Sequence, residues 1–188
     1  MTSFRIRETS RRYLFGTTLV LLLCGPAIAH AQGANNQAAA QALFDEGRRL
    51  MDQGKFADAC PKLESSQKLD PGAGTLMNLA SCYEKNGQTA SAWVTYTDAA
   101  SASAGRHPDW VDSAKQHVSA LEPKLSRLTV DVKAKADGLV VKRDGIVLSD
   151  GTSGVPIPVD PGKHIVEATA PGHVTFTATI TLGSNGAK

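Results

Sequence analysis

The pattern of hydrophobic and polar positions changes period near residue 125, which predicts two structural parts of different class. Before that point, apolar residues recur three and four positions apart in an Ala-, Gln- and Ser-rich sequence, the spacing of one helix face. After it, β-branched residues alternate with polar ones, as in strands with one buried face. We therefore expect an α+β chain in two domains, a helical domain over residues 39–125 and a β-domain over residues 126–183.

The helical part contains an internal repeat. The segment GKFADACPKL from Gly54 recurs as GQTASAWVTY from Gly87, about 33 residues later, and each copy follows an apolar helical run. The repeat predicts two helix pairs. A fifth helix is expected to open at Pro108, with Asp109 as its N-cap, and to end at Pro123. Because a repeat array must hide its last apolar face, this helix is interpreted as an end cap.

The period and several residues of these helix pairs resemble the tetratricopeptide repeat, a helix hairpin of about 34 residues. The matching positions are Gly47, Ala59 and Pro71 in the first unit and Leu76, Ala80, Tyr83 and Ala92 in the second. Small residues at such positions let two helices approach closely. The first unit lacks the early aromatic residue, and the second unit ends without the proline. The resemblance implies that the first helix of each pair lines a concave surface that binds a protein segment.

The same resemblance places Asn78 where family members often contact the peptide backbone of a ligand. Asn78 is therefore the candidate contact residue, although asparagine is also simply common at that position. The positive residues that flank it in carboxylate-binding members are absent, since the first unit offers Phe44 and Asp45 nearby. We expect no more than a weak contact with a peptide or a partner helix.

The β-part is expected to form a small antiparallel sandwich of five or six strands. The opening segment RLTVDV reads as a strand, and Asp144-Gly145 marks a hairpin. The prolines of VPIPV restrict that strand to an edge. In VTFTATITL, strict alternation predicts that Val174, Phe176 and every second residue to Leu182 face the core, with the threonines facing solvent. Residues 184–188 are expected to be a disordered tail.

This half resembles the PEGA family of envelope β-domains. The matching residues are the opening LTVDV, the turn at Arg143-Asp144-Gly145, the segment PVDPGKHIVEATAPGH and the closing alternating strand, and they cover most of residues 126–183. The motif consists of turns and alternation without catalytic residues. A tetratricopeptide part followed by a PEGA-like part is similar to a recurrent arrangement in exported bacterial proteins, particularly of myxobacterial type.

The N-terminus has the pattern of a secretory signal peptide. MTSFRIRETSRRYLF carries four arginines and one acid, and the apolar run GTTLVLLLCGPAIA and Ala29-His30-Ala31 follow. We expect cleavage after Ala31 and a flexible segment over residues 32–38. The apolar run is short of the roughly 20 residues of a membrane-spanning helix. Arg11-Arg12 resembles a twin-arginine export motif, so that route and ordinary Sec export both remain open. The expected location is the periplasm, the cell envelope or the exterior.

Removing the leader changes the charge and cysteine counts. Four of the 20 Lys and Arg and one of the 18 Asp and Glu belong to it, which leaves 16 basic and 17 acidic residues. A nearly neutral chain without a Lys/Arg cluster argues against nucleic-acid binding. The mature chain keeps Cys60 and Cys82, which in an oxidising compartment form either a disulfide or two free core thiols; the sequence leaves both open.

No residue pattern predicts catalysis, a metal site or a cofactor. Gly162-Lys163 lacks the upstream glycine and the following hydroxyl residue of a phosphate loop, and a strand rather than a helix is expected after it. His164 and His173 stand nine residues apart on one expected strand without further ligands, so His164 is expected to pack or pair within the β-domain. There is no G-x-S-x-G nucleophile motif.

These patterns predict an exported, non-catalytic interaction or scaffold protein of the cell envelope. The helical module would bind a protein segment, and the β-domain would dock on an envelope component. The alternative is a cell-wall or carbohydrate-binding module led by the β-domain. Such sites expose aromatic rings, whereas Phe176, the one aromatic residue of the β-half, is expected to point inward. A structural spacer without a ligand is the third reading.

Overall fold

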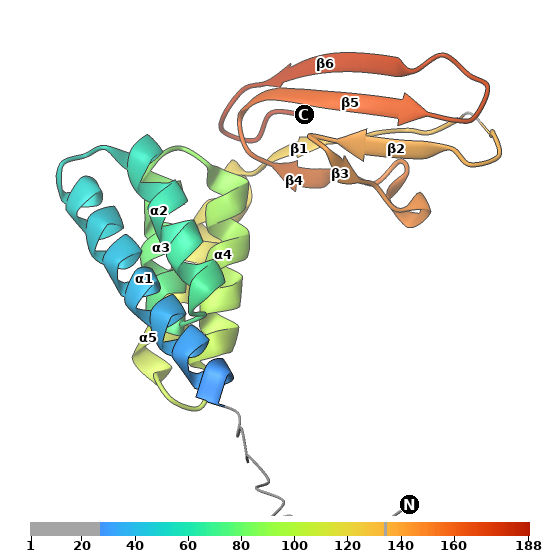
Figure 1. Cartoon of the computed structure of the whole chain (residues 1–188). Coiled ribbons are helices and arrows are strands. Elements are labelled where there is room, and N and C mark those ends of the chain that lie inside the picture. The colour runs from blue at the N-terminus through green and yellow to red at the C-terminus, as the bar shows by residue number, and fades with distance from the viewer. Residues whose placement is uncertain (1–26, 134) are drawn as a thin grey trace, which may run out of the picture.

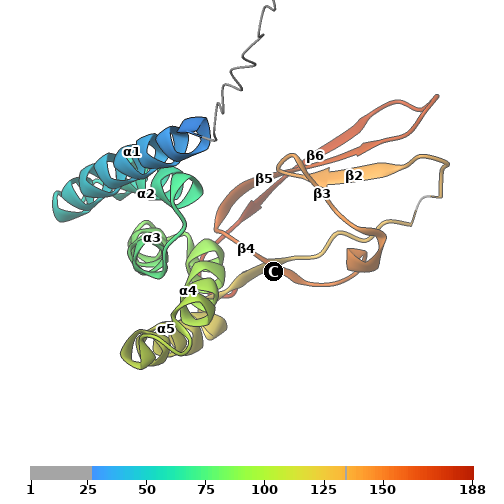
Figure 2. The ribbon, with the colours of Figure 1, turned by 60° about the horizontal axis from the view of Figure 1, so that its bottom comes forward.

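The computed structural model describes residues 27–133 and 135–188 and shows a helical part followed by a β-part (Figure 1). This confirms the expected α+β architecture in two parts. The helices are α1 (Ala27–Asp52), α2 (Phe56–Leu69), α3 (Ala73–Lys85), α4 (Thr89–Ser103) and α5 (Pro108–Leu121). Figure 2 shows them side by side in chain order, with the β-part joined on the side of α4.

The start of α1 differs from the sequence expectation. Residues 1–26 of the expected leader lie outside the described residues, and residues 27–31 begin α1. The segment 32–38, expected to be flexible, belongs to the same helix, so that expectation is wrong. The alanine- and glutamine-rich run that supports this helix begins only at Gln37 and extends to Ala42, and both residue types are strong helix formers. Within the described residues, no helix combines the length and the apolar character needed to cross a bilayer.

Small residues bring the helices into close contact, as the repeat pattern predicts. Gly47 of α1 is buried, and a Cβ atom there would lie 2.7 Å from Leu63 Cγ on α2. Ala59 on α2 and Ala80 on α3 have no exposed surface. The helical core has one cluster around Leu63 and the two cysteines and a second around Tyr96, with α3 contributing to both.

Helix α5 closes the array and starts at Pro108 as expected, but its N-cap lies two residues before the predicted one. Pro108 is its first residue, the N-cap is His107, and Asp109 lies in the first turn, so the predicted N-cap was wrong. Proline suits the first helical position because its φ is preset and its missing N–H would have no helical partner. Ala114 and Leu121 of this helix are buried in the second core cluster, so α5 covers the last face of the array.

A polar contact ties the last three helices together. Tyr96 Oη on α4 donates to Glu84 Oε2 on α3 at 3.0 Å, and His117 Nδ1 on α5 lies 2.9 Å from the same oxygen. The rings of Tyr96 and His117 stack with centroids 4.4 Å apart. Burial, and then the negative charge of Glu84, raise the pKa of Tyr96 above its ordinary value. The buried phenol therefore stays protonated and keeps donating.

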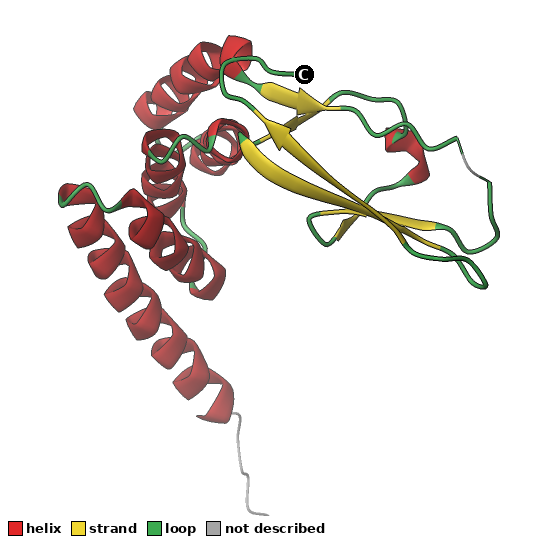
Figure 3. Ribbon diagram, turned by 90° about the horizontal axis from the view of Figure 1, so that it is seen from above, coloured by secondary structure: helices red, strands yellow, loops and turns green. Residues whose placement is uncertain are grey.

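The β-part forms antiparallel sheets in which the order of strands is β1-β4 and β3-β2-β5-β6. The Asp144-Gly145 hairpin is confirmed, with φ of 51° and 81° at the two turn residues. The longest strand pair extends away from the helices (Figure 3). The strands are β1 (Ser126–Leu128), β2 (Val140–Arg143), β3 (Ile146–Val147), β4 (Ile157–Val159), β5 (Gly162–Thr169) and β6 (Phe176–Leu182).

The expected sandwich is not confirmed, because the smaller sheet consists of two three-residue strands. The predicted opening strand RLTVDV ends at Leu128. Beyond it the chain makes irregular bonds: Gly154 N–H donates to Val130 O, and Val132 N–H donates to Ser153 Oγ. These bonds to a loop replace a regular ladder. Pro158 lies in β4, whose only partner among the described strands is β1, as expected for an edge.

The prediction that Phe176 faces the core is wrong. Its register is as expected, since residues 176, 178, 180 and 182 share one face of the sheet, but Phe176 is 61% exposed and Val174 is 96% exposed. Only Leu182, at the other end of β6, is buried. The short β1–β4 sheet lies at that end, where Ser126 Oγ donates to Gly183 O, and in the described residues nothing covers the Phe176 end.

The C-terminal residues also differ from expectation. Residues 184–188, expected to be disordered, lie along β1: Gly186 N–H donates to Lys124 O at 3.1 Å and Arg127 N–H donates to Ala187 O at 2.8 Å. The physical reason is that β1 is a sheet edge, whose free backbone groups favour a further extended segment.

Candidate functional site

Asn78 lies on α3 with both ends of its side-chain amide engaged. Asn78 Oδ1 accepts a hydrogen bond from Arg48 Nη1 on α1 at 3.0 Å, and Asn78 Nδ2 donates to Gly74 O at 2.8 Å. The two bonds define the orientation of the amide, since its oxygen faces a donor and its nitrogen an acceptor. Asn78 is half-buried, whereas Arg48 is exposed. A ligand at Asn78 would therefore also meet the Arg48 guanidinium.

Arg48 is a residue that the sequence interpretation missed. From the sequence, Phe44 and Asp45 are expected near Asn78, with no positive residue beside it. In the structure, Phe44 packs on the first core cluster and Asp45 accepts a bond from Gln41 at 2.9 Å, whereas the α1 side chain that bonds the amide is Arg48. The available signal was helical spacing, because Arg48 lies four residues after Phe44 and such residues share a helix face.

An aromatic residue adjoins this position. A Cβ atom at Gly74 would lie 3.6 Å from the Trp110 ring, so the indole of α5 covers the backbone to which Asn78 is bonded. We call Arg48, Gly74, Asn78 and Trp110 the Asn78 surface. It combines a cation, an amide and an indole from α1, α3 and α5. These are groups that recognise a peptide backbone and a carboxylate.

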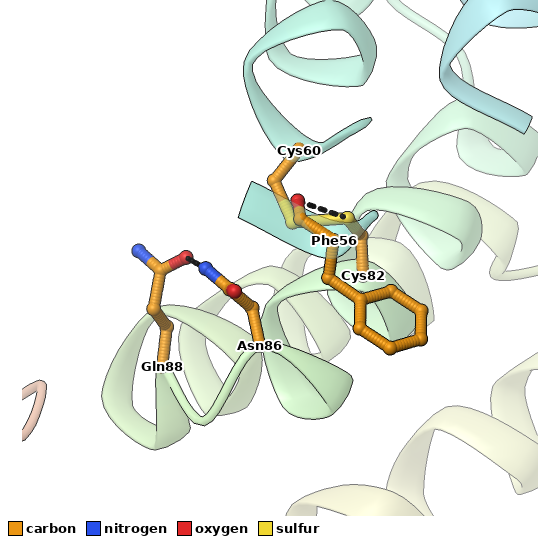
Figure 4. Close-up of a disulfide and its surroundings, with 5 residues drawn as sticks. All are labelled: Phe56, Cys60, Cys82, Asn86 and Gln88. Carbon is orange, nitrogen blue, oxygen red and sulfur yellow. Dashed lines mark hydrogen bonds between the residues drawn. A yellow bond between two sulfur atoms is a disulfide. The ribbon is translucent and has the colours of Figure 1, made fainter. Parts of the chain in front are cut away.

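Cys60 on α2 and Cys82 on α3 are bonded as a disulfide (Figure 4). Of the two alternatives left open by the sequence, the structure has the bridged form. Their Cα atoms are 5.6 Å apart and both residues are buried. Cys82 Sγ also lies 3.6 Å from Phe56 O, and because a disulfide sulfur has no proton this is a packing contact. The bridge links the first helix pair to the second and contributes no reactive thiol.

The junction between the two parts is built on Asp160, which follows β4. Helix α4 has no side-chain cap from its own N-cap residue, Gln88. Instead, Asp160 Oδ1 accepts the N–H groups of Ala90 at 2.8 Å and Ser91 at 2.9 Å, and Oδ2 accepts Ser91 Oγ at 2.5 Å. A carboxylate at a helix N-terminus satisfies free donors and complements the helix dipole. The β-part thus caps a helix of the helical part.

His164 connects this cap to the β2–β3 hairpin. Its ring is buried, with Nδ1 2.8 Å from Asp144 Oδ2 and Nε2 2.7 Å from Asp160 O. A carboxylate oxygen and a carbonyl oxygen, both acceptors, thus hold the two ring nitrogens in place. The expectation that His164 pairs within the β-domain is confirmed.

Asp144 is held in its ionised form by the same contacts. Burial raises the pKa of its carboxyl, but the hydrogen bonds from His164 and from Ile165 N–H, the latter at 2.9 Å, outweigh burial and bring the pKa below its ordinary value. Asp144, His164 and Asp160 therefore form a connected series of polar contacts from the hairpin to α4.

The remaining sequence candidates stay apart from these sites. Lys163 is exposed on β5, with a strand and no helix after it, so the phosphate-loop geometry is absent there. His173 lies exposed in the turn before β6, away from His164 at the other end of β5. Within residues 27–133 and 135–188, no three His, Cys, Asp or Glu side chains gather as a metal site would require.

We expect Asp160→Ala to lower the free energy of unfolding by about 1–2 kcal/mol, because it leaves the α4 donors without their cap. Asp98→Ala, which removes an exposed carboxylate from the same helix, is the matched control and should change it little. Urea unfolding followed by tryptophan fluorescence measures both. Equal losses for the two variants would show that Asp160 does not act as a cap.

Comparison with known proteins adds no relative: no family model, no curated protein and no solved structure matches this chain.

Proposed function

We propose that this chain is an exported, non-catalytic interaction protein of the cell envelope. Its helical part binds an extended protein segment at the Asn78 surface, and its β-part docks on another envelope component. The observation that carries the proposal is the contact of Arg48 with Asn78, which sets a cation beside an oriented amide on the helical surface. The tetratricopeptide resemblance and the leader pattern support the kind of ligand and the location.

The chemistry of the Asn78 surface favours a segment with a carboxylate. Arg48 offers planar, charged donors that match a carboxylate, and its present partner is a neutral amide oxygen. Trp110 adds an apolar ring that a side chain of the ligand can cover. Phe44, Gly74 and Thr75 also line a neighbouring cavity of about 210 Å³, which has room for one side chain of the ligand.

The test is a pull-down from envelope extract with four forms of the protein. Arg48→Ala and Asn78→Ala should each reduce the retained partner roughly tenfold, since a hydrogen bond to a charged group contributes about 1.5–3 kcal/mol. Arg49→Ala is the matched control, because Arg49 is the next arginine of α1 and pairs with Glu46. Equal retention by Arg48→Ala and Arg49→Ala would reject the Asn78 surface as the binding site.

The second candidate function, binding of a cell-wall polymer by the β-part, is favoured by one observation. Phe176 is exposed rather than buried, so the ring expected to be missing from the surface is present there. An exposed aromatic ring is what sugar rings stack on. Peptidoglycan sedimentation separates the two functions: pelleting that Phe176→Ala abolishes and Arg48→Ala leaves unchanged would favour the polymer.

A further inference from the structure

Strand β6 leaves one edge of the larger sheet without a partner. In the order β3-β2-β5-β6 it is the last strand, and its pairing within the described residues is with β5. Its sequence FTATITL contains no charge, proline or glycine, the features by which edge strands normally prevent pairing with another strand. The missing protection indicates that this edge takes a further extended strand.

The backbone groups that point outward belong to the threonines of β6. Ile165 of β5 directs its backbone toward the hairpin after β2, because Asp144 N–H donates to Ile165 O and Ile165 N–H donates to the Asp144 carboxylate. Backbone groups alternate between the two sides of a strand. His164 and Val166 therefore bond to β6, opposite residues 180 and 178. It follows that Thr177, Thr179 and Thr181 present free N–H and C=O groups at the edge.

The strand is complementary to itself. In an antiparallel pair of β6 strands related by a two-fold axis at Thr179, Thr179 faces its own copy and Thr177 faces Thr181 of the second copy. Threonine pairs directly opposite each other stabilise a sheet.

The same register gives Phe176 a place to bind. It sets Phe176 opposite Leu182 of the second copy, on the same face of the sheet. Beside Leu182 lies a groove of about 610 Å³ between β1 and β6. Leu128, Pro156 and Ile180 give it an apolar part, and its other lining residues are Arg127, Thr129, Thr181 and Lys188. The exposed ring of one copy thus reaches the groove of the other, and the two-fold axis repeats the contact. One arrangement therefore pairs the free edge of β6 and also places the exposed Phe176 ring in a groove.

We propose that this chain forms a homodimer through antiparallel pairing of β6 with β6 of a second copy, with each Phe176 in the β1–β6 groove of the other. The opposite edge of the sheet offers only the two residues of β3, so head-to-tail pairing of β6 with β3 has far fewer hydrogen bonds. Pairing of β6 with β6 of a second copy uses the same edge of both molecules and leaves neither edge free. It therefore gives a dimer rather than a filament.

Sedimentation equilibrium of the exported protein tests the dimer. Thr179→Pro removes an outward N–H and leaves the β5–β6 bonds intact, since proline is tolerated where the N–H faces outward. We expect this variant to be monomeric and Thr179→Val, which keeps the N–H, to remain dimeric. Phe176→Ala should raise the dissociation constant about tenfold or more, as for a ring at the centre of a contact. A monomeric wild type at submillimolar concentration, or equal dissociation constants for Thr179→Pro and Thr179→Val, would overturn the proposal.

Cross-linking tests the register independently. In the proposed pairing the two Thr179 Cα atoms lie about 5.5 Å apart, within the range of a disulfide. Oxidation of Thr179→Cys should therefore give a covalent dimer. Thr181→Cys is the matched control on the same strand and face. In the proposed pairing, residue 181 of one copy lies four residues along the strand from residue 181 of the other, roughly 13 Å away. Equal cross-linking of the two variants would reject a two-fold axis at Thr179, and cross-linking of neither would reject the dimer.

Discussion

Replacing Val166 by aspartate is expected to unfold the β-part, whereas Phe176→Asp leaves it folded. Val166 and Phe176 share one face of the larger sheet, but Val166 is 6% exposed and Phe176 is 61% exposed. A carboxylate at Val166 would be buried without a partner, which costs several kcal/mol. At Phe176 the new carboxylate stays in water, so a change of about 1 kcal/mol or less in unfolding free energy is expected.

Amide hydrogen exchange in peptides from β5 and β6 measures this effect directly. The protein should be dilute, so that association through β6 does not add to the stability of the sheet. Loss of protection in Val166→Asp, with near wild-type protection in Phe176→Asp, is the expected result. Similar protection in both variants would mean that residues 166 and 176 are buried to the same extent, which would contradict the structure.

Removing the disulfide is expected to lower the free energy of unfolding of the helical part by about 3 kcal/mol, from the loop entropy of a bridge across 22 residues. The double variant Cys60→Ala/Cys82→Ala, or reduction of the wild type by dithiothreitol, produces the change. Trp93 and Trp110 both lie in the helical part, so urea unfolding followed by tryptophan fluorescence reports on it.

The double variant also supplies the control for reduction. Dithiothreitol should shift the unfolding midpoint of the wild type and leave that of the double variant unchanged. Thiol titration of the unreduced protein should find no free thiol in the chain after Ala31. Two titratable thiols there, or a wild-type midpoint that does not respond to dithiothreitol, would show that the bridge does not form in solution.

The repeat motif predicted one residue of the Asn78 surface and missed another. The repeat pattern led to Asn78, because the pattern is local to one helix pair. It did not lead to Arg48, which lies 30 residues away and meets Asn78 only through the packing of α1 on α3. The junction between the helical part and the β-part was harder to predict. Asp160 caps α4 by accepting hydrogen bonds from Ser91 and Ala90, which lie 69 and 70 residues before it in the chain. No regular spacing of residues in the sequence predicts such a contact.

The amino-acid sequence by itself determined the change from helices to strands, the helix pairs and their close crossings, the Asp144-Gly145 hairpin and the faces of β6. Each of these follows from interactions between residues near one another along the chain, so the periodicity of apolar residues and the turn residues predict them. Only the tertiary structure decided which of those faces are covered. It leaves Phe176 in solvent, because the strands of the covering sheet are short, and it takes the cap of α4 from Asp160. Burial and long-range hydrogen bonds depend on which elements meet in space, and a local pattern does not contain that information.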